Sequence, residues 1–416
     1  MCVPDGRRGG PGAIDGPVRS PPSLAQRVLP AAVTLTAALA LAAGAALSRH
    51  SPAARIEAGH RTLLLAEEAA VRAARAPRDP WGGPLRPAPI ISRGKPVAAS
   101  RSGASVLVDG VYRAGSWAGG LPTEASPAWA AIRIGRGPTR VLLSFTSSHN
   151  HDYRDLFYGA PVDYRIETSA DSTDGANGTW RTAVTVRGNP VRSRAHAVDF
   201  AGQLWIRLVV TALAPEHNQW GLFLDEIDVH DLSLGGDDVW VFLGDSIGAG
   251  VFDRAPAHRP SFTDRIAAAH PGYEPATIDA GFCANRTGEV LARIDDVLAW
   301  NPDARVFAIL LGANDPDAET FRRDLDALVT RLQGAGKIVV VARLPYQTKY
   351  GEDYVAPKNR ALDRVVAAHG LLPGPDLDAW FRARPERLED GLHPDAQGSV
   401  ALIRLFADAV APLYPR

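Results

Sequence analysis

The sequence predicts an α/β domain built on a parallel sheet, preceded by an all-β sandwich and an N-terminal apolar span. From residue 239 onward, apolar β-prone runs alternate with amphipathic stretches, which is typical of βαβ crossovers and of a parallel sheet with helices on both faces. From 98 to 231, short β-prone runs are separated by turn signals such as Asp174-Gly175, and no long helical period intervenes. Residues 28–47 form an uncharged run of Ala, Leu and Val.

The run over 28–47 predicts an export signal or a signal-anchor. It is long enough to cross a bilayer core of about 30 Å at about 1.5 Å per residue. A basic flank precedes it, formed by Arg7, Arg8, Arg19 and Arg27. We therefore expect the folded parts to be extracytoplasmic, either secreted or anchored to a membrane by this span. Cleavage remains open, because small residues near 43–46 suit a signal peptidase whereas the leader is long and polar.

Composition divides the chain further. A basic, polar leader is expected over 1–27, and a helical stalk with a Pro-rich linker over 48–97. The sandwich is expected over 98–235 and the α/β domain over 236–416. A hydrophobic content of 46% is enough for two ordinary cores. The formal net charge of −1 gives no electrostatic reason to expect a nucleic-acid partner.

Local periodicity predicts the individual elements. In the sandwich, runs of strand length lie over 140–145, 163–168, 179–186, 204–210 and 222–229. In the α/β part, strands are predicted over 239–243, 276–280, 306–311 and 337–342, and helices over 261–269, 287–300, 319–332, 357–369 and 395–413. Sites in open parallel sheets form outside the carboxyl ends of the strands, so the residues that follow these strands are the functional candidates.

The first candidate is Ser246, in the sequence Gly244-Asp245-Ser246 that ends the apolar run from Val239. A buried strand here would present one serine at the mouth of a turn. A serine hydroxyl attacks poorly at neutral pH, so a nucleophilic role requires a histidine base, a carboxylate to orient it and hydrogen-bond donors for an oxyanion. Asp245 is expected mainly to bond the backbone of its own turn.

Two later segments contain suitable partners. Asp390 precedes His393 by three residues in a loop ahead of the last helical pattern, so it can hold one imidazole nitrogen while the other faces Ser246. Asn314 follows the predicted strand over 306–311, and its amide can donate to an oxyanion. Taken singly, Asn314, Asp390 and His393 would be interpreted as caps or turn residues.

Gly244-Asp245-Ser246, then Gly312-Ala313-Asn314-Asp315, then Asp390-Gly391-Leu392-His393, in that order, resemble the SGNH (GDSL-type) hydrolase family. The resemblance implies a flavodoxin-like sheet and ester hydrolysis without a cofactor. It implies Ser246 as nucleophile, His393 as base and Asp390 as its orienting acid.

The same resemblance implies that the oxyanion is held by the N–H groups of Ser246 and Ala284 and by the side chain of Asn314. Ala284 is a departure, because family members typically have glycine there. If the turn requires a positive φ, we expect the alanine to add strain.

The segment over 98–231 resembles a discoidin-type, galactose-binding-like jelly roll. The similarity lies in Asp109-Gly110, in a Tyr-x-Ile strand before Trp180, in Trp205-x-Arg207 and in Glu226-Ile227-x-Val229. It implies glycan binding, and a role as a spacer is the open alternative.

Metal binding is not predicted. His149, His151 and Asp152 fall in a Ser/Asn/Asp-rich loop, which is more typical of a solvated turn than of a metal site. Asp171 and Asp174 suit either a turn or a structural cation, and the sequence does not separate these.

The expected function is that of an exported serine esterase that removes acyl groups, acetyl foremost, from a carbohydrate. One alternative is a lipid esterase or acyltransferase with the same triad. Another is a catalytically inert, cell-surface carbohydrate-binding protein, which the alanine at 284 favours. The segment over 344–355, which holds Tyr346, Lys349, Tyr350 and Tyr354, is predicted to border the cleft.

Overall fold

The computed structural model describes residues 83–111, 117–147, 159–213, 221–248 and 256–415. The leader, the apolar span over 28–47 and the helical stalk lie outside these residues, as do His149, His151 and Asp152.

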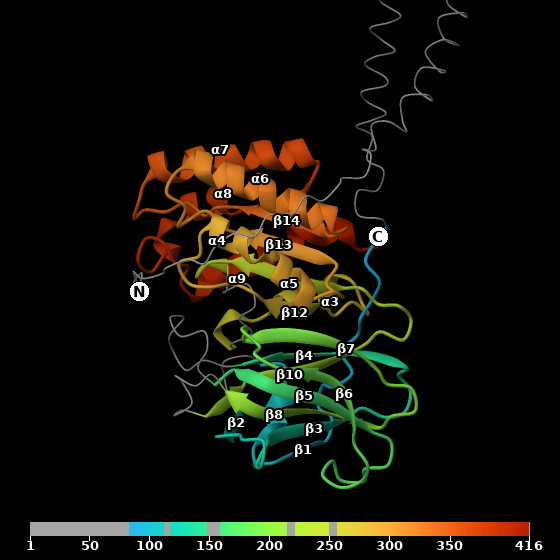
Figure 1. The fold of residues 1–416 in the computed structure, drawn as a ribbon. Coiled ribbons are helices and arrows are strands. Elements are labelled where there is room, and N and C mark those ends of the chain that lie inside the picture. The colour runs from blue at the N-terminus through green and yellow to red at the C-terminus, as the bar shows by residue number, and fades with distance from the viewer. Residues whose placement is uncertain (1–82, 112–116, 148–158, 214–220, 249–255, 416) are drawn as a thin grey trace, which may run out of the picture. The chain divides into compact units, whose positions relative to one another are not determined.

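The region before residue 235 is an antiparallel β structure (Figure 1). One sheet has the strand order β1-β3-β8-β5-β6, a second has the order β10-β4-β7, and β2 pairs with β9. The strands are β1 (Val97–Ala99), β2 (Trp117–Gly120), β3 (Ala128–Arg133), β4 (Arg140–Thr146), β5 (Pro161–Ser169), β6 (Arg181–Val186), β7 (Ser193–Asp199), β8 (Trp205–Leu213), β9 (Leu222–Leu224) and β10 (Glu226–Asp231), with a 3-10 helix η1 (Ala104–Val108) between β1 and β2. The run predicted over 222–229 is therefore two strands.

The two larger sheets share one core, which makes the region a sandwich. Ile132 and Ile206 from one sheet and Phe145 and Val229 from the other belong to the same buried cluster. Period-2 alternation explains this, because side chains of one strand point alternately to the two faces of its sheet. Its jelly-roll classification and its similarity to galactose-binding domains remain predictions.

The sheet β10-β4-β7 is buried on both faces. Leu142 and Ala195 point away from the sandwich core and belong to the apolar cluster of the following α/β region. Asp279, in β12 of that region, pairs with Arg192, and its N–H donates to Ser193 Oγ at 3.2 Å. Both charged side chains of the pair are buried.

The expectation of a linker up to residue 97 is wrong for the described part, 83–97. Leu85 and Ala88 are buried there. The N–H of Leu85 donates to Leu413 O at 2.9 Å, and His230 Nδ1 lies 2.7 Å from Ala88 O. These residues are therefore packed against the rest of the fold and do not form a free linker.

The C-terminal region confirms the predicted parallel α/β fold. Its sheet has the order β12-β11-β13-β14-β15, which is the flavodoxin-like order 2-1-3-4-5. All neighbouring strands are parallel. The elements are β11 (Val239–Gly244), η4 (Pro256–His258), α3 (Phe262–Ala269), β12 (Ala276–Asp279), α4 (Thr287–Ala292), α5 (Ile294–Trp300), β13 (Val306–Leu310), α6 (Ala318–Gly334), β14 (Ile338–Arg343), α7 (Glu352–His369), β15 (Leu372–Asp376), α8 (Leu377–Arg382), η5 (Pro385–Arg387), α9 (Ala396–Val410) and η6 (Ala411–Leu413).

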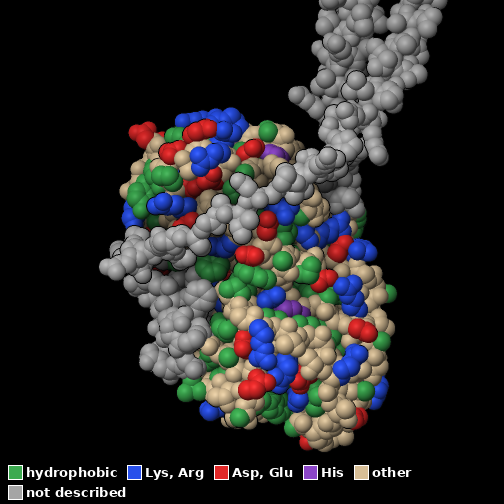
Figure 2. Space-filling view, viewed as in Figure 1, with side chains coloured by type: hydrophobic (Ala, Val, Ile, Leu, Met, Phe, Trp, Pro, Cys, Tyr) green, Lys and Arg blue, Asp and Glu red, His purple; other side chains and the backbone are tan. Residues whose placement is uncertain are grey.

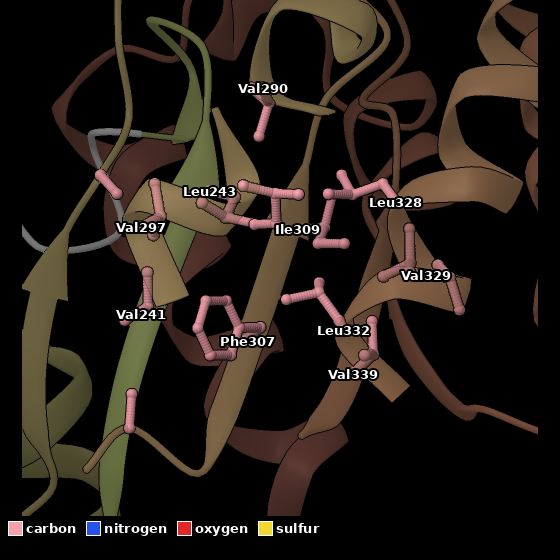
Figure 3. Packing of buried hydrophobic residues seen from close by; sticks show 14 of the residues in the cluster. Val241, Leu243, Val290, Val297, Phe307, Ile309, Leu328, Val329, Leu332 and Val339 are labelled. Atoms are coloured by element: carbon pink, nitrogen blue, oxygen red, sulfur yellow. The ribbon is translucent and has the colours of Figure 1, made fainter. Parts of the chain in front are cut away.

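Alternate residues of β11 pack on opposite sides of the sheet. Val241 and Leu243 join Phe307 and Ile309 of β13 against helices α4, α5 and α6, as Figure 3 shows, and residues of α7 belong to the same buried cluster. On the other side, Phe242 packs edge-on against rings of α3 and α9. Strands buried on both faces explain the continuous apolar runs in the sequence.

The segment Ala396–Leu413 is apolar and long enough to cross a bilayer, but half of it is buried within the domain, as in a core helix.

The elements of this region differ from the predicted ones in three notable places. The helix expected over 287–300 is two helices, α4 and α5. Helix α7 begins at Glu352, so Pro357 lies inside the helix and does not start it. Strand β15 was not predicted, because its sequence Leu-Pro-Gly-Pro-Asp lacks a strand pattern; it is tolerated at the edge of the sheet, where a ladder N–H can be missing.

Candidate active site

Ser246 lies two residues after the end of β11, at the switch point of the sheet, where β12 lies on one side of β11 and β13 on the other. The turn is tight: a Cβ on Gly244 would lie 2.8 Å from Gly248 Cα, so only glycine fits. Ser246 is half-buried, and its Oγ lies 2.8 Å from His393 Nε2.

The histidine comes from a loop between η5 and α9. His393 Nδ1 lies 2.9 Å from Asp390 Oδ2, and Asp390 Oδ1 accepts the N–H groups of His393 and Leu392 at 2.8 and 3.0 Å. Burial acts to raise the pKa of Asp390, but these hydrogen bonds outweigh it and lower the pKa to about 2. The carboxylate is therefore ionised at neutral pH, and it fixes both the backbone and the ring of His393.

This loop is also fixed from outside. Lys349 N–H donates to Gly391 O at 3.0 Å, so the predicted cleft segment does contact the catalytic loop. Gly391 has a φ of 77°, and a Cβ there would lie 2.6 Å from Thr348 Oγ1. Two separate reasons therefore require glycine at position 391: its positive φ and the close approach of Thr348.

Asn314 follows β13, on the neighbouring strand. Its Nδ2 lies 3.3 Å from Asp245 Oδ2 and 3.2 Å from Asn285 O. Both bonds are long, and together they occupy the two amide hydrogens. To hold an oxyanion, the amide would exchange one of these acceptors for the developing charge.

Asp245 is buried and serves its own turn. Its Oδ1 accepts the N–H of Ile247 at 2.9 Å, and its Oδ2 is the acceptor for Asn314. Burial is the main reason that the pKa of Asp245 is raised to about 6. The role expected from sequence, a turn residue, agrees with these contacts.

Ala284 lies in the loop after β12 and has a φ of 61°, the only positive φ of a non-glycine residue in the part of the chain that the structure describes. The loop is held to the serine strand, because Gly244 O accepts Phe282 N–H at 3.0 Å and Asn285 Nδ2 at 3.1 Å. The strain expected if the turn required a positive φ is therefore present, at a cost of about 1–2 kcal/mol. The backbone N–H that an oxyanion would use is unaffected by the methyl group.

Sequence reasoning did not predict that a group of polar residues holds the Asn314 loop in place. Asp315 accepts Thr287 N–H at 3.1 Å and Thr287 Oγ1–H at 2.9 Å, which joins this loop to the start of α4. Lys358 and Tyr354 of α7 donate to the loop's carbonyls. One signal was available: Lys358 falls at helical spacing between Val355 and Leu362, in a stripe that is otherwise apolar.

The remaining ligand candidates serve turns. Asp171 accepts the N–H of Thr179 at 2.8 Å, and Asp174 accepts that of Asn177 at 2.8 Å. Among the residues that the structure describes, no group of three or more His, Cys, Asp or Glu side chains is placed to hold a metal ion.

Replacing Ala284 by glycine should stabilise the protein. The substitution relieves the left-handed strain of about 1–2 kcal/mol and adds about 0.5–1 kcal/mol of unfolded-state entropy, so we expect a net gain of about 0.5–1 kcal/mol. Esterase activity should be retained, because the N–H donor remains. Denaturant unfolding of Ala284→Gly against the wild type measures the difference.

Ala327→Gly is the matched control, because Ala327 is exposed in the middle of α6 with ordinary helical geometry. It should lose about 1 kcal/mol. A loss of similar size in Ala284→Gly would show that the alanine is not strained.

The sequence was compared with known proteins. The model of the GDSL-like Lipase/Acylhydrolase family matches residues 242–401. No curated protein matches.

Several solved structures are similar. TesA is 20% identical, and the match covers 42% of this chain and 99% of that chain with a TM-score of 0.37. An acetylxylan esterase from Geobacillus stearothermophilus is 16% identical over 42% of this chain and 94% of that chain, with a TM-score of 0.36. A chitosan-binding module from a Paenibacillus sp. chitosanase/glucanase is 19% identical over 34% of this chain and 97% of that chain, with a TM-score of 0.27.

All three TM-scores lie below 0.5, so the assignment depends on the family model together with the parallel sheet that carries it. The matched residues contain the serine turn, the asparagine loop and the histidine loop. Residues 242–401 belong to the GDSL-like lipase/acylhydrolase family, and the chain is a carboxylic ester hydrolase.

Proposed function

We propose that this protein is an exported serine esterase that removes acyl groups, acetyl foremost, from a carbohydrate by means of Ser246, His393 and Asp390. The observation that carries the proposal is one chain of hydrogen bonds: Ser246 Oγ to His393 Nε2 at 2.8 Å, and His393 Nδ1 to Asp390 Oδ2 at 2.9 Å. This is the geometry that activates a serine at neutral pH.

In the first half-reaction, Ser246 Oγ attacks the ester carbonyl carbon while His393 Nε2 accepts its proton. The carbonyl electron pair moves to oxygen, and the N–H groups of Ser246 and Ala284 with the amide of Asn314 hold this oxyanion. Asp390 stabilises the imidazolium. When the carbonyl re-forms, the alcohol leaves with the proton from Nε2, and the acyl group remains on Ser246.

In the second half-reaction, water replaces the alcohol. His393 Nε2 accepts a proton from water as its oxygen attacks the acyl carbon. Collapse of the second oxyanion breaks the bond to Ser246 Oγ, which takes the proton back from His393. The products are a carboxylic acid and the free enzyme.

Two features favour a short acyl group on a polar carrier. Among the described large hydrophobic side chains, only Leu121, Leu234 and Tyr350 are exposed, which leaves little apolar surface for a long chain. Figure 2 shows Lys and Arg side chains mixed with Asp and Glu on the face in view, without dominance of either sign.

One feature of the sandwich supports the proposal that the substrate is a carbohydrate. On the outer face of the five-stranded sheet, the Arg207 guanidinium lies 3.8 Å from the ring centroid of Trp180 and 5.7 Å from that of Trp129. Half-buried tryptophans beside charged groups suit ligands that combine apolar faces with hydroxyls. Export, in turn, is supported by the apolar run over 28–47.

Ser246→Ala and His393→Ala should each lower kcat by several orders of magnitude, because each removes a group that acts as a unit with the other. Asn314→Ala should lower kcat by about 10²–10³, the usual cost of one oxyanion donor. Initial rates on p-nitrophenyl acetate measure both effects, and a fluorophosphonate probe should label the wild type but not Ser246→Ala. Intact wild-type protein that takes no label would instead indicate an inert α/β unit.

The acyl preference is tested with p-nitrophenyl acetate and palmitate in parallel, followed by acetate release from a panel of acetylated glycans. We expect kcat/KM to be higher for the acetate ester and at least one glycan to be deacetylated. Preference for palmitate would favour a lipid esterase, and transfer of the acyl group to an added alcohol would favour an acyltransferase.

A further inference from the structure

Lys358 of α7 is a buried cation behind the Asn314 loop. Its side chain belongs to a residue that is only 1% exposed, and its Nζ donates to Gly312 O at 3.0 Å and to Asp315 O at 2.6 Å. The Nζ also lies 3.5 Å from the ring centroid of Tyr354. The ammonium is thus bonded to the backbone at both ends of the loop.

An ammonium in this place needs an explanation, because removing a charge from water costs free energy. Burial is the main cause that lowers the pKa of Lys358 to about 8, against the opposing fields of Asp315, Asp317 and Asp245. An apolar side chain of similar length would fill the space without that cost, but it would remove the shortest hydrogen bond to each of two carbonyl groups. Gly312 O would keep only the Asp315 N–H at 3.3 Å, and Asp315 O only the Tyr354 hydroxyl at 3.1 Å.

Helix α7 supplies donors to the loop's backbone carbonyls. Besides the two bonds of Lys358, the Tyr354 hydroxyl lies 2.9 Å from Ala313 O and 3.1 Å from Asp315 O. Three carbonyl oxygens of the loop therefore face donors on α7. The side chain of Asn314 has other partners, because its amide donates to the Asp245 carboxylate and to the Asn285 carbonyl.

We propose that Lys358 is a positioning residue that fixes the Gly312–Asp315 loop, so that the Asn314 amide stays beside the place of the oxyanion and needs only to exchange one of its present acceptors for it. The inference rests on the proposed function, because it takes Asn314 as an oxyanion donor. A fixed loop limits the free energy that this exchange costs, because a donor that is already held close to the developing charge has little further to turn during the reaction. The ammonium also neutralises carbonyl oxygens whose negative ends would oppose that charge.

The same network reaches the second donor. Asp315, whose carbonyl bonds Lys358, accepts two hydrogen bonds from Thr287 through its carboxylate. Thr287 begins α4, shortly after Ala284. One lysine thus supports both the side-chain donor and the turn that carries a backbone donor.

The chain offers a close control in Lys337. Its Nζ also donates to two backbone carbonyls, Pro302 O at 3.0 Å and Ala304 O at 2.6 Å, and burial lowers its pKa as well. These carbonyls precede β13, whereas those bonded by Lys358 follow it. The two lysines make similar bonds at opposite ends of one strand, and only Lys358 is at the end that carries Asn314.

The test compares Lys358→Met with Lys337→Met on p-nitrophenyl acetate, with thermal melting to confirm folding. We expect Lys358→Met to lose about 10- to 100-fold in kcat, less than or equal to the cost of removing a donor outright, with little change in KM. Lys337→Met should keep the wild-type kcat even where its melting temperature falls. Lys358→Arg retains the charge and should recover part of the loss.

Two further readouts separate positioning from mere support of the fold. Because the loop needs the protonated ammonium, kcat of the wild type should decline above about pH 8, and Lys358→Arg should move this decline to higher pH. Should Lys358→Met fail to fold, Tyr354→Phe removes only a hydroxyl from the same carbonyls and should lower kcat several-fold at unchanged KM.

Equal loss of kcat in the two methionine variants would overturn the proposal, as would an unchanged kcat in Lys358→Met. A change confined to KM would do the same. Failure of the proposed function is distinguishable, because Ser246→Ala would then keep the activity of the wild type whatever Lys358 does.

Discussion

The hydrogen bond between Ser246 Oγ and His393 Nε2 joins residues that are 147 positions apart in the chain, and the catalytic account depends on it. The two atoms lie 2.8 Å apart only because three parts of the chain are in place. These are the strand before Ser246, the tight turn in which only glycine fits at position 244, and the His393 loop, which Asp390 fixes. The parallel sheet supplies the common frame, since the carboxyl ends of its strands meet at one edge. The helices packed on both faces of the sheet stabilise it, and so they fix the positions of these strand ends.

A second set of polar contacts connects the loops at this edge of the sheet. The carboxyl of Asp245, the Asn285 carbonyl and the Asp315–Thr287 pair connect the loops after three different strands. Each bond is modest alone, but a fully partnered buried network allows few alternative arrangements. The same network offsets the strain of the left-handed Ala284, because hydrogen bonds hold Phe282 and Asn285 on either side of it.

Local sequence patterns predicted what depends on local physics. Strand β11 and Ser246 followed from an apolar run ending in glycine, and α3 followed from an amphipathic stretch over 261–269. The capping box at Ser261, which the structure adds, agrees with that start. β15 could not be found in this way, because its prolines are acceptable only at a sheet edge that tertiary structure creates. The apolar stripe around Lys358 could have indicated that this lysine is buried, but its role could not be predicted, because its carbonyl partners lie more than 40 residues away in the chain. The burial of Leu142 toward the α/β region likewise depends on packing between distant strands.

A structure of the protein after reaction with a small phosphonate ester tests the central claim most directly, because the phosphoryl oxygen stands in for the oxyanion. The account predicts phosphorus bonded to Ser246 Oγ and its oxygen within hydrogen-bonding distance of the N–H groups of Ser246 and Ala284. It also predicts that Asn314 Nδ2 has released one of its present acceptors to reach that oxygen. An adduct whose oxygen points away from Asn314 and Ala284, or one on a residue other than Ser246, would contradict the account.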